Sequence, residues 1–139
     1  MKILVAVDGS PFTKRMLAYL AAHDEWLGQH HEYTVLTVVP AVPPRAAAVL
    51  DKDALKAYYA DEAEKTFKSI RTFFAKQKLK ADFVFKVGHA AEVIGKQADT
   101  GHDLVVMGSH GHSALGNLVM GSTATKVLAA CKTPVLLVR

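Results

Sequence analysis

Short apolar runs alternate with segments of helical periodicity along this chain, and this rhythm constrains the fold more than any other feature. Five runs are apolar and mostly β-branched or aliphatic: residues 3–7, 33–39, 83–87, 104–107 and 135–138. Such runs are typical of strands buried on both faces, as in a parallel sheet. Four helical segments separate them, which predicts βαβ units with helices on both faces of the sheet.

Local signals predict where the first helix begins and ends. Ser10 and Pro11 follow the first apolar run. We expect the Ser10 side chain to accept a hydrogen bond from a helix amide, and Pro11 to occupy the first helical position. Apolar residues then recur at helical spacing as far as Leu27, and Gly28 predicts the end of the helix.

The other helices are predicted in the same way. Asp51 is expected to cap a long helix that runs to about Gln77. Two shorter helices are predicted, one starting near Ala90 and one over residues 122–130. The Pro/Ala stretch at residues 40–48 is predicted to be a loop.

The size and charge of the chain limit its class. We predict one domain over residues 1–139, because domains of about 100–150 residues are the commonest. The net charge of +4 is too small and too dispersed to indicate a nucleic-acid partner. No run approaches the roughly 18 apolar residues of a membrane span, and no signal peptide is recognisable, so we expect a cytoplasmic protein without a membrane partner.

Residues suited to binding gather after two of the predicted strands. The first strand is followed by Asp8-Gly9-Ser10, and the fourth by a glycine-rich loop that starts at Gly108. In open α/β sheets a ligand binds at the carboxyl ends of the strands, where the strand order reverses. If these two strands are neighbours, both segments face one crevice.

The glycine-rich loop has a defined spacing. Gly108, Gly111 and Gly121 form the pattern G-x2-G-x9-G, which Ser122 and Thr123 follow at a predicted helix start. Glycines let a backbone approach a ligand, and free amides at a helix N-terminus favour phosphate. The alternative is that Ser122 or Thr123 only caps the helix.

The sequence argues against four other kinds of site. Asn117 stands where a Walker A loop requires Lys, and no G-x-G-x-x-G dinucleotide fingerprint occurs. Ser113 is not in a nucleophile elbow, because Leu115 replaces the final glycine. His110 and His112 without a neighbouring Cys or carboxylate are a weak metal signal, so we expect no metal site formed by the protein alone.

The sequence resembles the universal stress protein family over essentially its whole length. Four blocks carry the resemblance, namely residues 3–10, 103–111, 121–128 and 133–138. The spacing G-x2-G-x9-G-S/T is that of the ATP-binding members. The resemblance implies an α/β, Rossmann-like fold, similar to the adenine nucleotide alpha hydrolases. It would be a doubly wound five-stranded parallel sheet of order 3-2-1-4-5 with four helices. It also implies a homodimer through residues 133–139.

The resemblance further implies an ATP site between strands one and four, with three parts. The adenine pocket would be lined by Ala6, Val38 and Met107. The ribose, or a bound metal, would be contacted by Asp8, and Gly108 would approach the ribose. Val7 is also expected at the nucleotide site. The phosphates would be held by Gly111, Gly121, Ser122 and Thr123.

One departure from the family concerns charge. The spacer between Gly111 and Gly121 carries no Lys or Arg, although relatives often have a basic residue there. Charge compensation for ATP would then fall to backbone amides, to Mg²⁺ or Mn²⁺, or to His110 and His112. AMP or ADP is therefore expected to bind comparably.

Together these features predict a small ATP-binding module of the stress response, with at most slow ATP hydrolysis. Two alternatives stay open: an interaction protein that does not use nucleotide, and a slow ATPase. For the ATPase, only Asp8, His110 and His112 are near enough to activate water. A nucleotide titration and a turnover assay separate the three.

Overall fold

Five parallel strands form one sheet in the computed structural model, which describes residues 1–23, 25–112 and 119–139. Their order is β3-β2-β1-β4-β5, which confirms the predicted fold class. In chain order the strands are β1 (Lys2–Ala6), β2 (Glu32–Val39), β3 (Ala81–Val87), β4 (Leu104–Gly108) and β5 (Val135–Val138). β1 and β4 pair directly, so the two strand ends rich in binding residues are neighbours.

The central strands are buried because both of their faces are covered. Leu4, Val5, Val105 and Val106 have no exposed surface. Val5 and Val106 belong to the core on one face of the sheet, and Leu4 and Val105 belong to the core on the other. Burying a side chain of this size contributes about 1.5–3 kcal/mol, which explains the continuous apolar runs.

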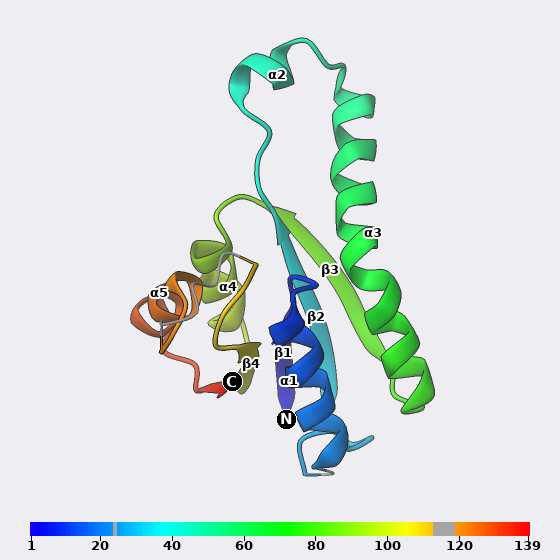
Figure 1. Ribbon diagram of the computed structural model, residues 1–139, viewed down its shortest axis with the longest axis vertical. Coiled ribbons are helices and arrows are strands. Elements are labelled where there is room, and N and C mark those ends of the chain that lie inside the picture. The colour runs from blue at the N-terminus through cyan, green and yellow to red at the C-terminus, as the bar shows by residue number, and fades with distance from the viewer. Residues whose placement is uncertain (24, 113–118) are drawn as a thin grey trace.

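Helices cover the sheet from both sides (Figure 1). α1 (Pro11–Ala22) and α3 (Lys52–Lys76) pack on one face, and α4 (Ala90–Ala98) and α5 (Ser122–Ala130) pack on the other. A fifth helix among the described residues, α2 (Pro44–Ala48), falls where the sequence predicts a loop. That prediction is wrong because Pro44 suits a first helical position, and the Ala47 amide donates to the Pro43 carbonyl over 2.9 Å.

α1 is shorter than its apolar spacing predicts. The helix ends at Ala22, and His23 is extended with its ring stacked on Tyr19, 4.2 Å between centroids. The turn that follows is held from the sheet, since the Tyr33 hydroxyl donates to the Gly28 carbonyl over 2.8 Å. The apolar spacing therefore continues beyond Ala22 without a helix, because a side chain from β2 binds the turn backbone.

α3 is the longest of the described helices, and only its second half packs on the sheet. Asp51 caps it as predicted and accepts a hydrogen bond from the Ala54 amide over 2.6 Å. Its buried side chains are Ala63, Phe67, Ile70 and Phe74. The first turns of α3 project with α2 beyond the sheet, at the top of Figure 1.

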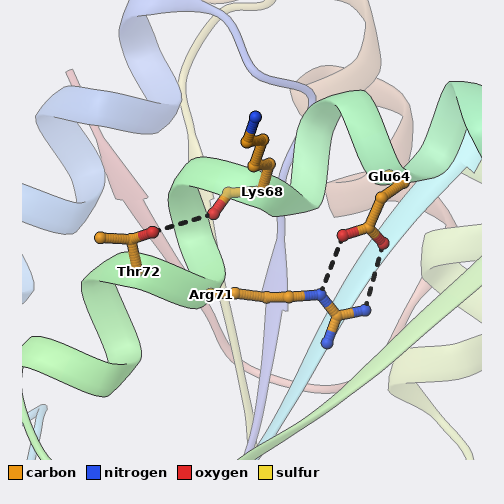
Figure 2. A network of polar contacts seen from close by, with 4 residues as sticks. All are labelled: Glu64, Lys68, Arg71 and Thr72. Carbon is orange, nitrogen blue, oxygen red and sulfur yellow. Dashed lines mark hydrogen bonds and ion pairs between the residues drawn. The ribbon is translucent and has the colours of Figure 1, made fainter.

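The outer surface of α3 is charged. The Arg71 Nε lies 3.3 Å from the Glu64 carboxylate (Figure 2), and its guanidinium lies 4.3 Å from the ring centroid of Phe83 on β3. Exposed ion pairs contribute only about 0–1 kcal/mol, so covering the aromatic ring is the larger role of this side chain.

Within the described part of the chain, no helix is both long and apolar enough to cross a bilayer.

Candidate functional site

A cavity of about 500 Å³ opens at the carboxyl ends of β1, β2 and β4. This volume lies within the range of about 300–1,000 Å³ that small-molecule sites occupy. Every site residue predicted from the sequence lines it: Ala6, Val7, Asp8, Val38, Met107, Gly108, His110, Gly111, His112, Gly121, Ser122 and Thr123. The fold thus brings both strand ends to one cavity. Ser113, Leu115 and Asn117, which bear on the rejected elbow and Walker A interpretations, lie outside the described residues.

One wall of the cavity is apolar. Ala6 is paired in register with Leu36 on β2 and with Met107 on β4, and all three side chains belong to the core beneath α4 and α5. Val38 packs against the same core. Because the Ala6 side chain is the shortest of these, it leaves room between its neighbours for a flat apolar group.

Asp8 uses its two carboxylate oxygens differently. Oδ1 accepts hydrogen bonds from the Ser10 amide and from the Thr13 hydroxyl, each over 2.9 Å. Among the described residues, none donates a hydrogen bond to Oδ2. One oxygen therefore stabilises the turn after β1, and the other is an available acceptor at the cavity.

Ser10 does not act as predicted. It occupies the N-cap position of α1, but its hydroxyl makes no cap hydrogen bond. Its Oγ is fully buried and has no partner within the described residues. The prediction of a Ser10 side-chain cap is wrong because the Asp8 carboxylate and the Thr13 hydroxyl organise this turn instead.

Two glycines of the loop permit close contacts within the protein. A Cβ at Gly111 would lie 2.6 Å from Asp8 Oδ2, so a side chain there would displace the carboxylate. A Cβ at Gly121 would lie 3.1 Å from both the Ser109 carbonyl oxygen and the His110 Cα. The φ of Gly121 is −72°, so this position requires space rather than a left-handed backbone.

α5 begins at the cavity without a side-chain cap. Its N-cap is Gly121, and no described side chain accepts a cap hydrogen bond there. The interpretation in which Ser122 or Thr123 only caps the helix therefore has no support. Both residues present amides and hydroxyls at a helix start, where free amides and the helix dipole favour an anion.

Both loop histidines already contact the protein. The His110 Nδ1 lies 2.9 Å from the Ser109 hydroxyl, and its ring lies against Phe12 with 4.8 Å between centroids. The His112 Nε2 is hydrogen-bonded to the Asp8 carbonyl, which ties the loop after β4 to the end of β1. The imidazoles therefore help to shape the cavity.

The charges of the lining are unusual for an anion site. Asp8 and Glu62 supply two carboxylates, and the described lining contains no Lys or Arg. No group of three or more metal-ligating side chains gathers in the described part of the chain. An anionic ligand would therefore be held by backbone amides and by the dipole of α5 rather than by cationic side chains.

Other lining residues were not predicted from the sequence. They are Thr13, Leu36, Thr37, Val39, Pro40, Glu62, Thr66, Ala90, Ile94 and Ala124. Val39 and Pro40 could have been found, since the strand-end rule applies equally to β2. Glu62 and Thr66 lie one turn apart on α3, and no local pattern indicates which turn of a long helix borders a cavity.

Comparisons with a family profile and with individual sequences point to the same protein family. The profile of the universal stress protein family matches residues 1–139. A universal stress protein of Thermus aquaticus is 36% identical over 141 residues, covering 99% of this chain and 97% of that protein. Universal stress protein Slr1230 of Synechocystis is 34% identical over 139 residues, which are 99% of this chain and 42% of the length of that relative.

Solved structures share the fold. MJ0577 of Methanocaldococcus jannaschii has a TM-score of 0.78 at 28% identity, with 99% of this chain and 94% of that chain covered. An Archaeoglobus fulgidus universal stress protein in complex with dAMP has a TM-score of 0.69 at 20% identity, with 100% and 98% covered. An Arabidopsis thaliana family protein with AMP bound has a TM-score of 0.69 at 13% identity, with 99% and 90% covered. At such low identity the last two show likeness of fold alone.

Proposed function

The chain belongs to the universal stress protein family, and we propose that it is an adenine-nucleotide-binding module of the stress response. One observation carries the proposal: a single cavity joins an apolar wall, the Asp8 carboxylate and the uncapped start of α5. These three surfaces match the base, the sugar and the phosphates of a nucleotide in their chemistry. Relatives of the same fold solved with AMP or dAMP support the ligand class.

The proposed pose follows from these surfaces. Adenine lies against Ala6, Val38 and Met107, where burial of its ring is favourable. The ribose lies beside Asp8 and Gly108, because only the sugar and the base carry donors for a carboxylate. The phosphates lie at Gly111, Gly121, Ser122 and Thr123, where backbone amides supply donors.

The charge of the lining bears on which nucleotide binds. Without Lys or Arg in the described lining, each added phosphate brings negative charge near Asp8 and Glu62. Mg²⁺ or Mn²⁺ bound to the phosphates near Asp8 would offset this repulsion for ATP. AMP and ADP, with fewer phosphates, depend less on a metal.

We extend the proposal to assembly and location. β5 is an edge strand of half-buried Val135, Leu136 and Leu137, and such an edge exposes unpaired backbone groups. A second copy pairing antiparallel along residues 133–139 would cover it across a two-fold axis. Residues 1–139 would form one domain, working in the cytoplasm where adenine nucleotides are plentiful.

Native mass spectrometry of freshly purified protein tests the ligand directly, because a retained nucleotide adds its own mass. Calorimetric titration with ATP, ADP and AMP then measures affinity, and a phosphate-release assay measures turnover. Saturable binding with negligible turnover is expected. Failure of all three nucleotides to bind would favour an interaction protein that does not use nucleotide, and steady phosphate release would favour a slow ATPase.

A further inference from the structure

Thr13 was not singled out by its sequence pattern, yet its hydroxyl makes two hydrogen bonds to Asp8. It lies in the first turn of α1, is 5% exposed, and borders the cavity. Its Oγ1 donates to Asp8 Oδ1 over 2.9 Å and accepts from the Asp8 amide over 3.2 Å. The hydroxyl therefore holds both the backbone and the side chain of Asp8.

Gly111 completes this arrangement from the opposite side. Its missing Cβ would lie 2.6 Å from Asp8 Oδ2, so the carboxylate occupies space that any other residue would fill. Oδ1 cannot move away easily, because that would break its bonds to the Thr13 hydroxyl and the Ser10 amide. The orientation of Asp8 is thus determined by contacts on two different segments.

We propose that Thr13 is a positioning residue for nucleotide recognition, and that Gly111 leaves the room this positioning needs. Thr13 keeps Oδ1 engaged with the protein, so that Oδ2 is the one carboxylate oxygen left for a ribose hydroxyl. The inference rests on the proposed function of the cavity. It assigns to the second glycine of the motif a role in seating a carboxylate, besides any contact with phosphate.

The acceptor Oδ2 requires a donor, and the ribose supplies it because the base lies against the apolar wall in the proposed pose. An ionised carboxylate only accepts hydrogen bonds, and the phosphate of a nucleotide is mostly ionised at neutral pH and so offers it few donors. A ribose hydroxyl does donate, and a bond to a charged acceptor is among the stronger ones. A carboxylate turned by one rotamer would lose this contact, which is why a residue that holds Asp8 affects affinity without touching the ligand.

The test measures binding of AMP, 2′-deoxy-AMP and 3′-deoxy-AMP by calorimetry in the presence of EDTA. The unmodified protein is expected to bind AMP more tightly than the deoxy analogue that lacks the contacted hydroxyl. Thr13→Val should weaken AMP binding roughly tenfold and remove this discrimination, because the hydrogen bond to Oδ1 is lost. Thr13→Ser keeps the hydroxyl, so it should retain the AMP affinity and the discrimination of the unmodified protein.

Two further variants support the interpretation. Thr72→Val removes a hydroxyl from the exposed face of α3, where its Oγ1 donates to the Lys68 carbonyl (Figure 2). This control should change neither the AMP affinity nor the discrimination against the deoxy analogue. Gly111→Ala crowds Oδ2 from the opposite segment and should reproduce the loss of discrimination, even if Thr13→Val folds poorly. A crystal structure of either variant is expected to contain a rotated Asp8 side chain.

Several results would overturn the inference. Folded Thr13→Val with unchanged AMP affinity and discrimination would make Thr13 a packing residue only. Equal affinity of the unmodified protein for AMP and both deoxy analogues would remove the ribose contact while leaving the proposed function intact. If the unmodified protein binds no adenine nucleotide, the proposed function fails first, and the inference fails with it.

Discussion

The amide of Gly121 donates a hydrogen bond to the Ser109 carbonyl over 2.7 Å, which joins the start of α5 to the end of β4. The Ser109 amide in turn donates to the Val138 carbonyl over 2.8 Å, so the same residue is also tied to the edge strand. The third glycine of the motif therefore lies where the loop returns to the sheet. Its close packing determines where the first amides of α5 lie.

Gly121→Val should abolish ATP binding and leave the domain folded. The new side chain would press on the Ser109 carbonyl and the His110 backbone and displace the start of α5. Calorimetry with ATP, together with circular dichroism, checks this. Gly95→Ala is a matched control, since its Cβ would be similarly crowded, 3.2 Å from Ala130 Cβ, outside the cavity lining. Equal ATP affinity for folded Gly121→Val would show that the motif is only structural here.

Asp8→Asn separates the role of this side chain in the turn after β1 from its proposed role in binding the ribose. The amide oxygen can still accept from the Ser10 amide and Thr13, so thermal stability should change little. The NH₂ group would replace Oδ2 and could not accept from a ribose hydroxyl, so AMP affinity should fall by about 1.5–3 kcal/mol. Asp8→Ala should lower both stability and affinity. Loss of stability with unchanged affinity in both variants would indicate a turn role alone.

Mg²⁺ should strengthen the binding of ATP more than that of AMP. The described lining offers two carboxylates and no Lys or Arg to a triphosphate, so a bound cation should offset more repulsion for ATP than for AMP. Calorimetry with each nucleotide, in Mg²⁺ and in EDTA, measures the difference. Ser122→Ala should weaken the binding free energy of ATP by about 1–3 kcal/mol, both in Mg²⁺ and in EDTA. An identical metal effect on ATP and AMP would argue against a metal bridging the phosphates.

The sheet was predictable because its determinants are local. Burial on both faces requires the apolar runs around Val5 and Val106, and such runs are visible in the sequence. The site was predictable as far as its residues follow a strand end. The contribution of Thr13 was not, because a hydroxyl in a first helical turn has the same sequence context whether it caps a helix or holds a neighbouring carboxylate.

Helix ends were harder to predict because they depend on contacts from distant segments. α1 ends at Ala22 although the apolar spacing continues, since the Tyr33 hydroxyl of β2 binds the following turn. α2 is a single short helix built on Pro44, in a composition that also suits a loop. The end of α1 thus depends on a residue of β2, whereas the signal for α2 is local but fits a loop equally well.

Asp99 should make the stability of the protein depend on acid pH. The largest cause that lowers the pKa of this carboxyl is the hydrogen bond from the Thr133 hydroxyl to Oδ1, which is 2.9 Å long. Hydrogen bonds from the Lys132 and Thr133 amides lower the pKa further. A lowered folded-state pKa means that the stabilisation is present above the unfolded value of about 3.9 and is lost as pH falls through the folded value.

Asp99→Ala should therefore lower the melting temperature at pH 7, with a difference that shrinks below about pH 4. Thermal unfolding across this range measures it. Asp61→Ala removes an exposed aspartate of α3 and serves as the control. A difference between Asp99→Ala and the unmodified protein that does not vary with pH would contradict the ionic origin of the effect.

Leu136→Lys should convert a dimer into a monomer, because a charge on β5 opposes pairing with a second copy. Light scattering at micromolar concentration measures the mass, and circular dichroism confirms folding. Phe85→Lys places the same charge on the opposite edge strand, β3, and should leave the mass unchanged. A monomeric unmodified protein at this concentration would contradict the proposed interface.

The position of β1 between β2 and β4 also determines the order in which the protein can be completed. Ile3 pairs with Tyr33 on one side and with Leu104 on the other, about a hundred residues along the chain. Contacts this distant slow folding, because a long loop must close before they form. The ribosome synthesises the N-terminal strands first, so one edge of β1 remains unpaired until β4 has been synthesised. The cavity is thus among the last features to form, and a bound nucleotide would report that folding is complete.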